Sequence, residues 1–207
     1  MIRNRAQVYT DFFRVFHETA SPRCRDYGGG TPNPHGHAAS MEALLSFIEA
    51  IQVRCLQSCE FLDRLPEVWD AGSGASTAVL CNEGWNVTTF DPDHEYMDEV
   101  ITTVKKMGLK PPMIGQILPA SQSGPCDACF YDYGTHHRLD FMPRFMRLTR
   151  SVFYIDDCHA PTIEVVAERL GQPYTWSLSM KDEHHRYGML IVNDSEDDLM
   201  GGRDNRI

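Results

Sequence analysis

The stretch from Glu67 to Thr77 constrains the fold of this chain more than any other. It begins with apolar residues typical of a short buried strand and places the carboxylate of Asp70 at the tip of that strand. Gly72 and Gly74 then permit a tight turn close to a ligand, and a helix is expected from about Ala75 to Leu80. A strand, a glycine turn and a helix N-terminus bring backbone N–H groups and the positive end of a helix dipole to one place. The stretch therefore predicts a binding site for a nucleotide-like ligand.

Two classes of ligand are possible interpretations of this turn. A dinucleotide-binding fold would carry a third glycine where this chain has Thr77, so that motif fits poorly. An acidic residue two positions before the first glycine, as in the run from Asp70 to Gly74, instead resembles the D/E-x-G-x-G motif of the S-adenosylmethionine (SAM)-dependent methyltransferases. Short Gly-x-Gly turns also serve as plain connections between a strand and a helix, so the rest of the chain must decide.

Strand and helix patterns alternate along the chain. Short β-branched or apolar runs predict further strands over Asn86 to Phe90, Pro112 to Leu118, Ala128 to Tyr131 and Val152 to Ile155. Apolar residues at helical spacing predict helices over Val8 to Phe16, after an N-cap at Ser40, after Asp93, over Leu139 to Leu148 and from Pro161 to Gly171. Near the C-terminus, no helical pattern separates two further strand patterns, which lie over Tyr174 to Leu178 and Gly188 to Val192.

This order of elements predicts an α/β fold in one main domain. The expected architecture is a doubly wound, mostly parallel seven-stranded sheet with helices on both faces and one antiparallel strand in a C-terminal hairpin. Residues 1–40 are expected to hold an N-terminal helix and a lid-like loop, rich in proline and glycine, from Ser21 to Ala39. Residues 41–194 form the main domain, and residues 195–207 are expected to be a flexible tail.

Composition narrows the class of protein. With 207 residues, 42% of them hydrophobic and 23% charged, the chain can form one globular domain with a sizeable core. It has no apolar run of transmembrane length and no signal-peptide core, so a cytoplasmic protein without a membrane partner is expected. The 19 basic and 29 acidic residues give a formal net charge of -10, which would repel a phosphate backbone. Nucleic acid is therefore not an expected partner.

The seven cysteines are odd in number and spread through predicted helices and strands, which indicates reduced thiols. Cys126 and Cys129 form a C-x-x-C pair, but the pair leads into an apolar strand and has no second Cys or His pair at zinc-binding spacing. Ordinary buried thiols are favoured over a metal site.

A second acidic residue is expected beside the glycine turn. Asp91 follows the strand over Asn86 to Phe90, about twenty residues after the turn, where a carboxylate can accept hydrogen bonds from two ribose hydroxyls. Asp93 fits the N-cap of the next helix, which leaves Asp91 for a ligand. Gln116, at the end of the third strand, lies where an adenine amino group would need a partner.

With these features in order, the chain from Met41 to Asp194 resembles the class I SAM-dependent methyltransferases. The resemblance implies that SAM is the cofactor and that its binding residues are Asp70, Gly72, Gly74, Ser76, Asp91, Gln116 and Asp132. Asp132 after the fourth strand, and Asp156 with Asp157 after the fifth, also resemble the magnesium ligands of metal-dependent O-methyltransferases. The macrocin, catechol and caffeoyl-coenzyme A enzymes are examples of that subgroup.

A physical argument for a metal stands beside the resemblance. Adjacent tips of parallel strands open on the same side, so Asp132 and Asp156 can converge although they are far apart in sequence. Together with Asp157 they make three carboxylates without a nearby Lys or Arg in sequence, which would repel one another unless a hard dication lay between them. Proton sharing or exposure to solvent is the alternative.

The predicted proton acceptor is His136, four positions after Asp132. Some of the relatives carry a catalytic lysine one position earlier, where this chain has Thr135. Histidine has an unperturbed pKa of about 6.5 and can take a hydroxyl proton near neutral pH. His137 and His159 are rivals, and the alternative interpretation is a solvent-exposed His-His-Arg run at a helix start. Asp132 and His136 are therefore the predicted catalytic residues.

These residues predict methyl transfer from SAM to a hydroxyl group of a small molecule, assisted by magnesium. A metal-free methyltransferase acting on nitrogen, carbon or a protein side chain is one alternative. A catalytically inactive nucleotide-binding module with the same fold is another, because fold does not fix function. The sequence identifies neither the methyl acceptor nor the oligomeric state, and a homodimer is compatible with it.

Overall fold

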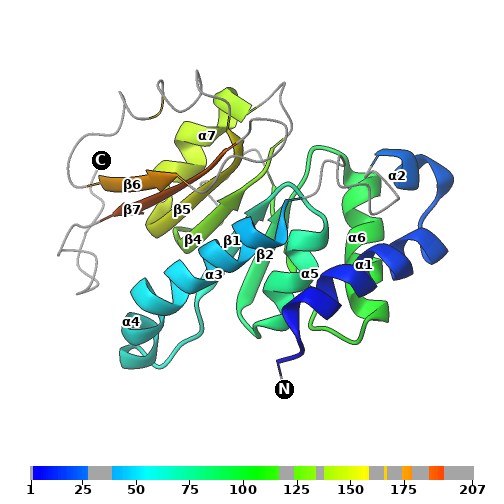
Figure 1. Cartoon of the computed structure of the whole chain (residues 1–207), viewed down its shortest axis with the longest axis horizontal. Coiled ribbons are helices and arrows are strands. Elements are labelled where there is room, and N and C mark those ends of the chain that lie inside the picture. The colour runs from blue at the N-terminus through cyan, green and yellow to red at the C-terminus, as the bar shows by residue number, and fades with distance from the viewer. Residues whose placement is uncertain are drawn as a thin grey trace.

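The computed structural model describes residues 2–27, 39–116, 124–133, 138–158, 166, 174–178 and 187–193 (Figure 1). In this part of the chain, strands and helices alternate as the sequence predicts. No helix among the described residues is both long and apolar enough to cross a membrane.

The strands form one seven-stranded sheet in the order β3-β2-β1-β4-β5-β7-β6. Their bounds are Glu67–Ala71 for β1, Asn86–Phe90 for β2, Met113–Ile114 for β3, Cys126–Tyr131 for β4, Thr149–Cys158 for β5, Tyr174–Leu178 for β6 and Tyr187–Asn193 for β7. Neighbouring strands from β3 through β5 run parallel, whereas β7 is antiparallel to both β5 and β6. The predicted mostly parallel sheet with a C-terminal antiparallel hairpin is confirmed.

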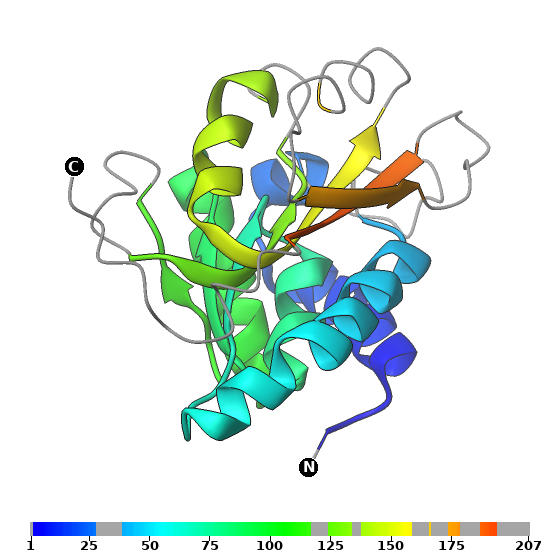
Figure 2. The same ribbon diagram turned by 90° about the vertical axis from the view of Figure 1, so that its left-hand side faces the viewer.

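Helices cover both faces of the sheet, as Figures 1 and 2 show. Their bounds are Arg5–Thr19 for α1, Pro22–Tyr27 for α2, Met41–Arg54 for α3, Leu56–Phe61 for α4, Ala75–Asn82 for α5, His94–Lys106 for α6 and Arg138–Arg147 for α7. One core contains Val68, Phe130 and Tyr154 and is covered by α3, α5 and α6, with α1 outside them. The other core contains Trp69 and Phe153 and is covered by α7. Successive strand residues thus face opposite cores, as the pleat requires.

The N-terminal helix α1 packs on α5 and α6 rather than on the sheet. It buries Val8, Phe12 and Phe16 at helical spacing, and the Arg5 guanidinium donates two hydrogen bonds of 2.7 Å to the buried carboxylate of Glu83. The residue range expected as a loop, Ser21 to Ala39, begins with the short helix α2. Residues 28–38 lie outside the described residues, so the lid and the division at residues 40 and 194 stay predictions.

Several predicted element bounds differ from the structure. β5 extends to Cys158, so Asp156 and Asp157 lie within the strand rather than after it. β3 has two residues, because it is an edge strand preceded by prolines, which lack the N–H that a ladder needs. The helix expected from Pro161 and the tail from Ser195 fall outside the described residues, apart from Val166, which is helical.

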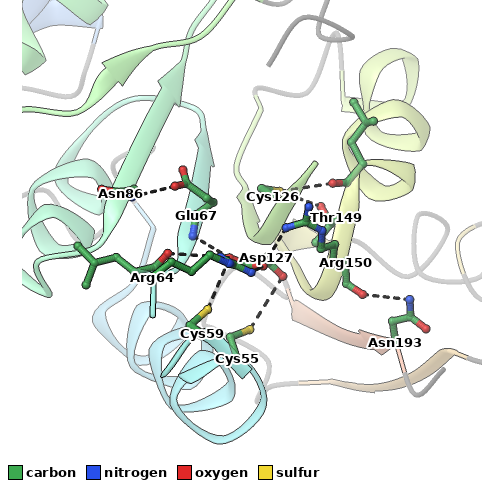
Figure 3. A network of polar contacts seen from close by, with 12 residues as sticks. Cys55, Cys59, Arg64, Glu67, Asn86, Cys126, Asp127, Thr149, Arg150 and Asn193 are labelled. Carbon is green, nitrogen blue, oxygen red and sulfur yellow. Dashed lines mark hydrogen bonds and ion pairs between the residues drawn. The ribbon is translucent and has the colours of Figure 1, made fainter. Parts of the chain in front are cut away.

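A buried carboxylate network joins the amino ends of the central strands (Figure 3). Asp127 of β4 accepts hydrogen bonds of 2.5 and 2.7 Å from Arg64, 3.3 Å from Arg150 of β5 and 2.8 Å from the Glu67 N–H of β1. Burial alone would raise the pKa of Asp127, but these hydrogen bonds and the two arginine charges outweigh it and lower the pKa. The network therefore ties three strands together through one fully partnered carboxylate.

The cysteines are buried and free, as predicted. Cys126 and Cys129 lie in β4, and Cys55 and Cys59 lie against Asp127 (Figure 3). Burial raises the pKa of Cys55 to about 12 and that of Cys59 to about 11, so these thiols stay protonated at neutral pH.

Candidate cofactor-binding site

The glycine turn after β1 is fixed on both sides by its neighbouring strands. The Gly72 N–H donates to the Phe90 carbonyl at 2.9 Å, and the Asp132 N–H donates to the Ala71 carbonyl at 2.7 Å. Gly72 has φ +111°, and a Cβ there would lie 2.3 Å from the Asp132 carbonyl oxygen. Only glycine satisfies both conditions, which explains the first glycine of the motif.

Asp70 is buried inside the site and is only partly hydrogen-bonded. Its side chain is 0% exposed, and it lies within β1 rather than at its tip. The Thr77 hydroxyl donates to Oδ2 at 2.5 Å, and the Thr89 hydroxyl lies 3.5 Å from the same oxygen. Among the described residues, Oδ1 has no hydrogen-bond partner. A buried acceptor without a partner is rare in folded proteins, and it marks a place where a ligand or a water belongs.

The electrostatics of Asp70 agree with this geometry. The pKa of Asp70 is raised to about 7, mainly by burial and also by the neighbouring charge of Asp91, while the hydroxyls of Thr77, Ser76 and Thr89 act in the opposite direction. A carboxylate that titrates near neutral pH is typical of a functional site.

Asp91 follows β2 directly and lies beside the turn. Its two oxygens accept hydrogen bonds from the Ser73 N–H at 3.1 Å and from the Asp93 N–H at 2.9 Å. Burial raises the pKa of Asp91 to about 6, and these two backbone hydrogen bonds oppose the shift. Each carboxylate oxygen retains a free lone pair, so Asp91 can still accept from a ligand. Asp93 caps α6 through the Tyr96 N–H at 3.0 Å, as predicted, whereas the ligand role of Asp91 stays a prediction.

Gln116 follows β3, the strand that pairs with β2. Thr89 of β2 pairs with Ile114 of β3, so Asp91 and Gln116 each lie two positions beyond a paired residue, at the same edge of the sheet. Gln116 is exposed. The Gly115 N–H donates to the Thr89 carbonyl at 2.8 Å and holds this corner of the site.

Thr77 has a role that the motif comparison missed. It occupies the position of the third glycine in the dinucleotide motif, and its hydroxyl accepts a hydrogen bond of 3.0 Å from the Gly74 N–H while it donates to Asp70. The signal was present in the sequence, because a threonine three residues after an N-cap has capping-box spacing. Ser76, a predicted cofactor residue, is buried in the same first turn of α5.

Asp132 and Asp156 are brought together by the sheet. Tyr131 of β4 pairs with Ile155 of β5, so the next residue of each strand is a neighbour of the other. Both acids affect the pKa of Tyr9 in α1. Burial is the main cause that raises this pKa to about 12, and the charges of Asp156 and Asp132 add to the shift. Tyr9 donates a hydrogen bond of 2.8 Å to the Ala39 carbonyl. The N-terminal helix thus brings a side chain near the two acids, which the sequence did not predict.

The predicted metal site is not assembled by the described residues. Within them, no group of three or more His, Cys, Asp or Glu side chains is arranged to hold a metal ion. The side chain of Asp157, the third predicted ligand, lies outside what the structure describes. His136, its rivals His137 and His159, and Thr135 also lie outside the described residues. The magnesium ion and the base stay predictions, and no reaction step is derived through a metal.

Comparisons with known proteins address the fold. No protein-family model matches the sequence, and no curated protein matches it. Among solved structures, the chain is similar to the O-methyltransferase TomG from Streptomyces achromogenes, which is involved in tomaymycin synthesis and was solved in complex with SAM. The TM-score is 0.57, and the sequence identity is 14% over 86% of this chain and 89% of that chain. The fold is that of the SAM-dependent methyltransferases.

Two further structures agree with this assignment. A putative O-methyltransferase from Klebsiella pneumoniae has TM-score 0.58 and 13% identity over 90% of each chain. An O-methyltransferase from Bacillus cereus in complex with SAH has TM-score 0.55 and 15% identity over 87% of this chain and 90% of that chain. These three similarities each cover 86% to 90% of this chain, so they concern the fold as a whole and not only the glycine turn.

Proposed function

We propose that this protein binds SAM at the carboxyl ends of β1, β2 and β4 and transfers its methyl group to a hydroxyl of a small molecule. The observation that carries the proposal is the buried Asp70 carboxylate, whose Oδ1 has no partner among the described residues and which lies beside a glycine turn. Such a group destabilises the folded protein unless a ligand uses it.

The residues of the site fit the cofactor. Asp91 has free lone pairs for two ribose hydroxyls, and Gln116 is exposed at the end of the neighbouring strand for the adenine amino group. The buried Asp70 supplies negative charge for a positively charged ligand. When bound, SAM supplies a methyl group on a cationic sulfur, which is transferred without a covalent bond to the protein.

The remaining tasks of the protein are to orient the acceptor and to remove its proton. We assign the proton to His136, with His137 and His159 as rivals, and acceptor orientation to Asp132 and Asp156, which are neighbours in the sheet register. A hydroxyl acceptor is favoured because the three structurally similar proteins described above are named as O-methyltransferases. Magnesium bound by Asp132, Asp156 and Asp157 is part of the proposal, and the metal-free alternative remains its main competitor.

The test is calorimetric titration of the full chain with SAM and with S-adenosylhomocysteine (SAH). Asp91→Ala should weaken binding about tenfold or more, because a charge-assisted hydrogen bond contributes roughly 1.5 to 3 kcal/mol. Asp98→Ala is the matched control, since Asp98 is an exposed acid of α6. Unchanged affinity in Asp91→Ala, or no binding by the unaltered protein, would overturn the proposal.

Turnover with a library of hydroxylated small molecules tests the finer parts. His136→Ala should slow turnover roughly 100-fold while SAM affinity stays nearly constant. Excess chelator should abolish turnover and added magnesium should restore it. Full turnover in chelator would reject the metal and favour the metal-free alternative, and a loss below about tenfold in His136→Ala would reject that base.

A further inference from the structure

The Thr77 hydroxyl makes hydrogen bonds to two parts of the candidate site, the Gly74 N–H at the start of α5 and the Asp70 carboxylate. Its oxygen accepts from the Gly74 N–H at 3.0 Å and its proton is donated to Asp70 Oδ2 at 2.5 Å. The direction of both bonds is fixed, because a backbone N–H can only donate and the hydroxyl has a single proton. Thr77 therefore couples the N-terminus of α5 to the Asp70 carboxylate.

Packing alone does not account for a hydroxyl at this position. Thr77 is 0% exposed in the buried helix α5, and valine would have nearly the same shape there. A buried hydroxyl costs free energy unless its hydrogen bonds are made. Here both are made, and both connect elements of the candidate site.

The hydroxyl also determines which oxygen of Asp70 is available. Oδ2 is occupied by Thr77 and lies near Thr89, whereas Oδ1 has no partner among the described residues. Among the described residues, the titratable groups that interact with the Asp70 charge include Asp91 of the β2 end, Cys81 of α5, Cys129 of β4 and Tyr133 after β4, and none of these four is a cation. Hydroxyl donors therefore carry the stabilisation of the ionised carboxylate.

We propose that Thr77 is a positioning residue of the cofactor site: its hydroxyl favours the ionised form of Asp70 and directs Oδ1 to the ligand. This inference rests on the proposed binding of SAM. A ligand that donates hydrogen bonds to Asp70 binds the ionised form, so its affinity rises as the pH increases through the Asp70 titration. Loss of the Thr77 donor makes ionisation harder and moves that rise to higher pH.

The experiment measures SAH affinity by calorimetry from about pH 5.5 to about pH 9 for the unaltered protein, Thr77→Val and Thr77→Ser. Thr77→Val should lose about tenfold in affinity near pH 7, with the midpoint moved up by about one pH unit and a smaller loss near pH 9. Thr77→Ser keeps the hydroxyl and should restore the midpoint. A uniform loss at every pH, or a midpoint unchanged in Thr77→Val, would overturn the inference.

The same comparison made in the Asp70→Asn variant separates the inference about Thr77 from the proposed function. Asp70→Asn has no carboxylate to titrate, so adding Thr77→Val to it should cause no further shift of the pH midpoint. A shift that persists there would contradict the role of Thr77. If Thr77→Val does not fold, Thr77→Ala gives the same comparison. No SAH binding by the unaltered protein would overturn the proposed function itself, whereas binding with an unchanged Thr77→Val profile would overturn this inference alone.

Discussion

Asp127, at the amino end of β4, and Asp70, near the carboxyl end of β1, are both buried aspartates of the central sheet, but their surroundings are opposite. Asp127 accepts hydrogen bonds from two arginines and a backbone N–H, and its pKa is lowered (Figure 3). Asp70 has hydroxyl donors near one oxygen and no partner on the other among the described residues, and burial raises its pKa to about 7.

The difference in hydrogen bonding distinguishes a carboxylate that stabilises the sheet, Asp127, from one that is available to a ligand, Asp70. The fully partnered carboxylate ties three strands together, so its removal should cost stability. The partly partnered carboxylate costs stability in the ligand-free protein, and such a cost is typical of a binding site. In open α/β sheets, ligands bind at the carboxyl ends of the strands, which is where Asp70 and Asp91 lie.

The largest expected effect concerns Asp127, at the amino end of β4. Asp127→Asn leaves Arg64 and Arg150 without their counter-charge, and it should lower the free energy of unfolding by about 3 to 4 kcal/mol in urea denaturation. Glu18→Gln is the control, because Glu18 pairs with Arg14 at 3.6 Å on the exposed surface, and it should change stability by less than about 0.5 kcal/mol. Equal effects of the two substitutions would contradict a special role for the network.

A somewhat smaller effect is expected at Gly72, in the glycine turn after β1. Gly72→Ala forces a Cβ against the Asp132 carbonyl at a positive φ, and it should lower the free energy of unfolding by about 3 kcal/mol. Gly108→Ala has φ +72° but nothing within 4 Å of the added Cβ, so about 1 kcal/mol is expected from the same urea titration. A Gly72→Ala protein as stable as Gly108→Ala would show that the turn is not fixed as described.

The smallest effect is the dependence of stability on pH. Between its ordinary pKa of 3.8 and its folded pKa of about 7, Asp70 binds more protons in the folded than in the unfolded state, so stability falls as pH rises through this window. Asp91 acts in the same direction, from 3.8 to about 6. The ligand-free protein should lose on the order of 2 kcal/mol between about pH 6 and about pH 8.

Variants assign this pH dependence to one end of the sheet. Asp70→Asn should remove the larger part of the slope of the urea-derived stability curve over this range and leave the contribution of Asp91. The lowered pKa of Asp127 gives stability that is present above its ordinary pKa of 3.8 and lost only as the pH falls through its folded value. Asp127→Asn should therefore leave the slope between about pH 6 and about pH 8 unchanged. A slope that stays unchanged in Asp70→Asn and disappears in Asp127→Asn would reverse the comparison.

The sequence predicts the strands and the turn well because these depend on local patterns. The strand over Asn86 to Phe90, the caps at Ser40 and Asp93 and the hairpin of β6 and β7 all agree with the structure. Apolar periodicity and capping residues determine such elements within a few positions of the chain.

The partners of buried polar groups could not be predicted in the same way. Arg64 and Asp127 are 63 positions apart, and only the tertiary fold brings the segment between α4 and β1 to the start of β4. Tyr9 approaches Asp132 and Asp156 because α1 packs across α5 and α6, a tertiary arrangement without a local signal. The extent of β5, which places Asp156 inside the strand, likewise depends on pairing with β4 and β7.

The most direct test of the central claim is a titration of the side-chain carboxyl carbons of Asp70, Asp91 and Asp127 by NMR, without and with SAH. The account predicts midpoints near 7 for Asp70 and near 6 for Asp91 in the ligand-free protein, and both should fall by about one unit or more when SAH binds. Asp127 should titrate below its ordinary range in both states. Ordinary midpoints for Asp70 and Asp91, or midpoints that SAH leaves unchanged, would contradict the assignment of this end of the sheet to ligand binding.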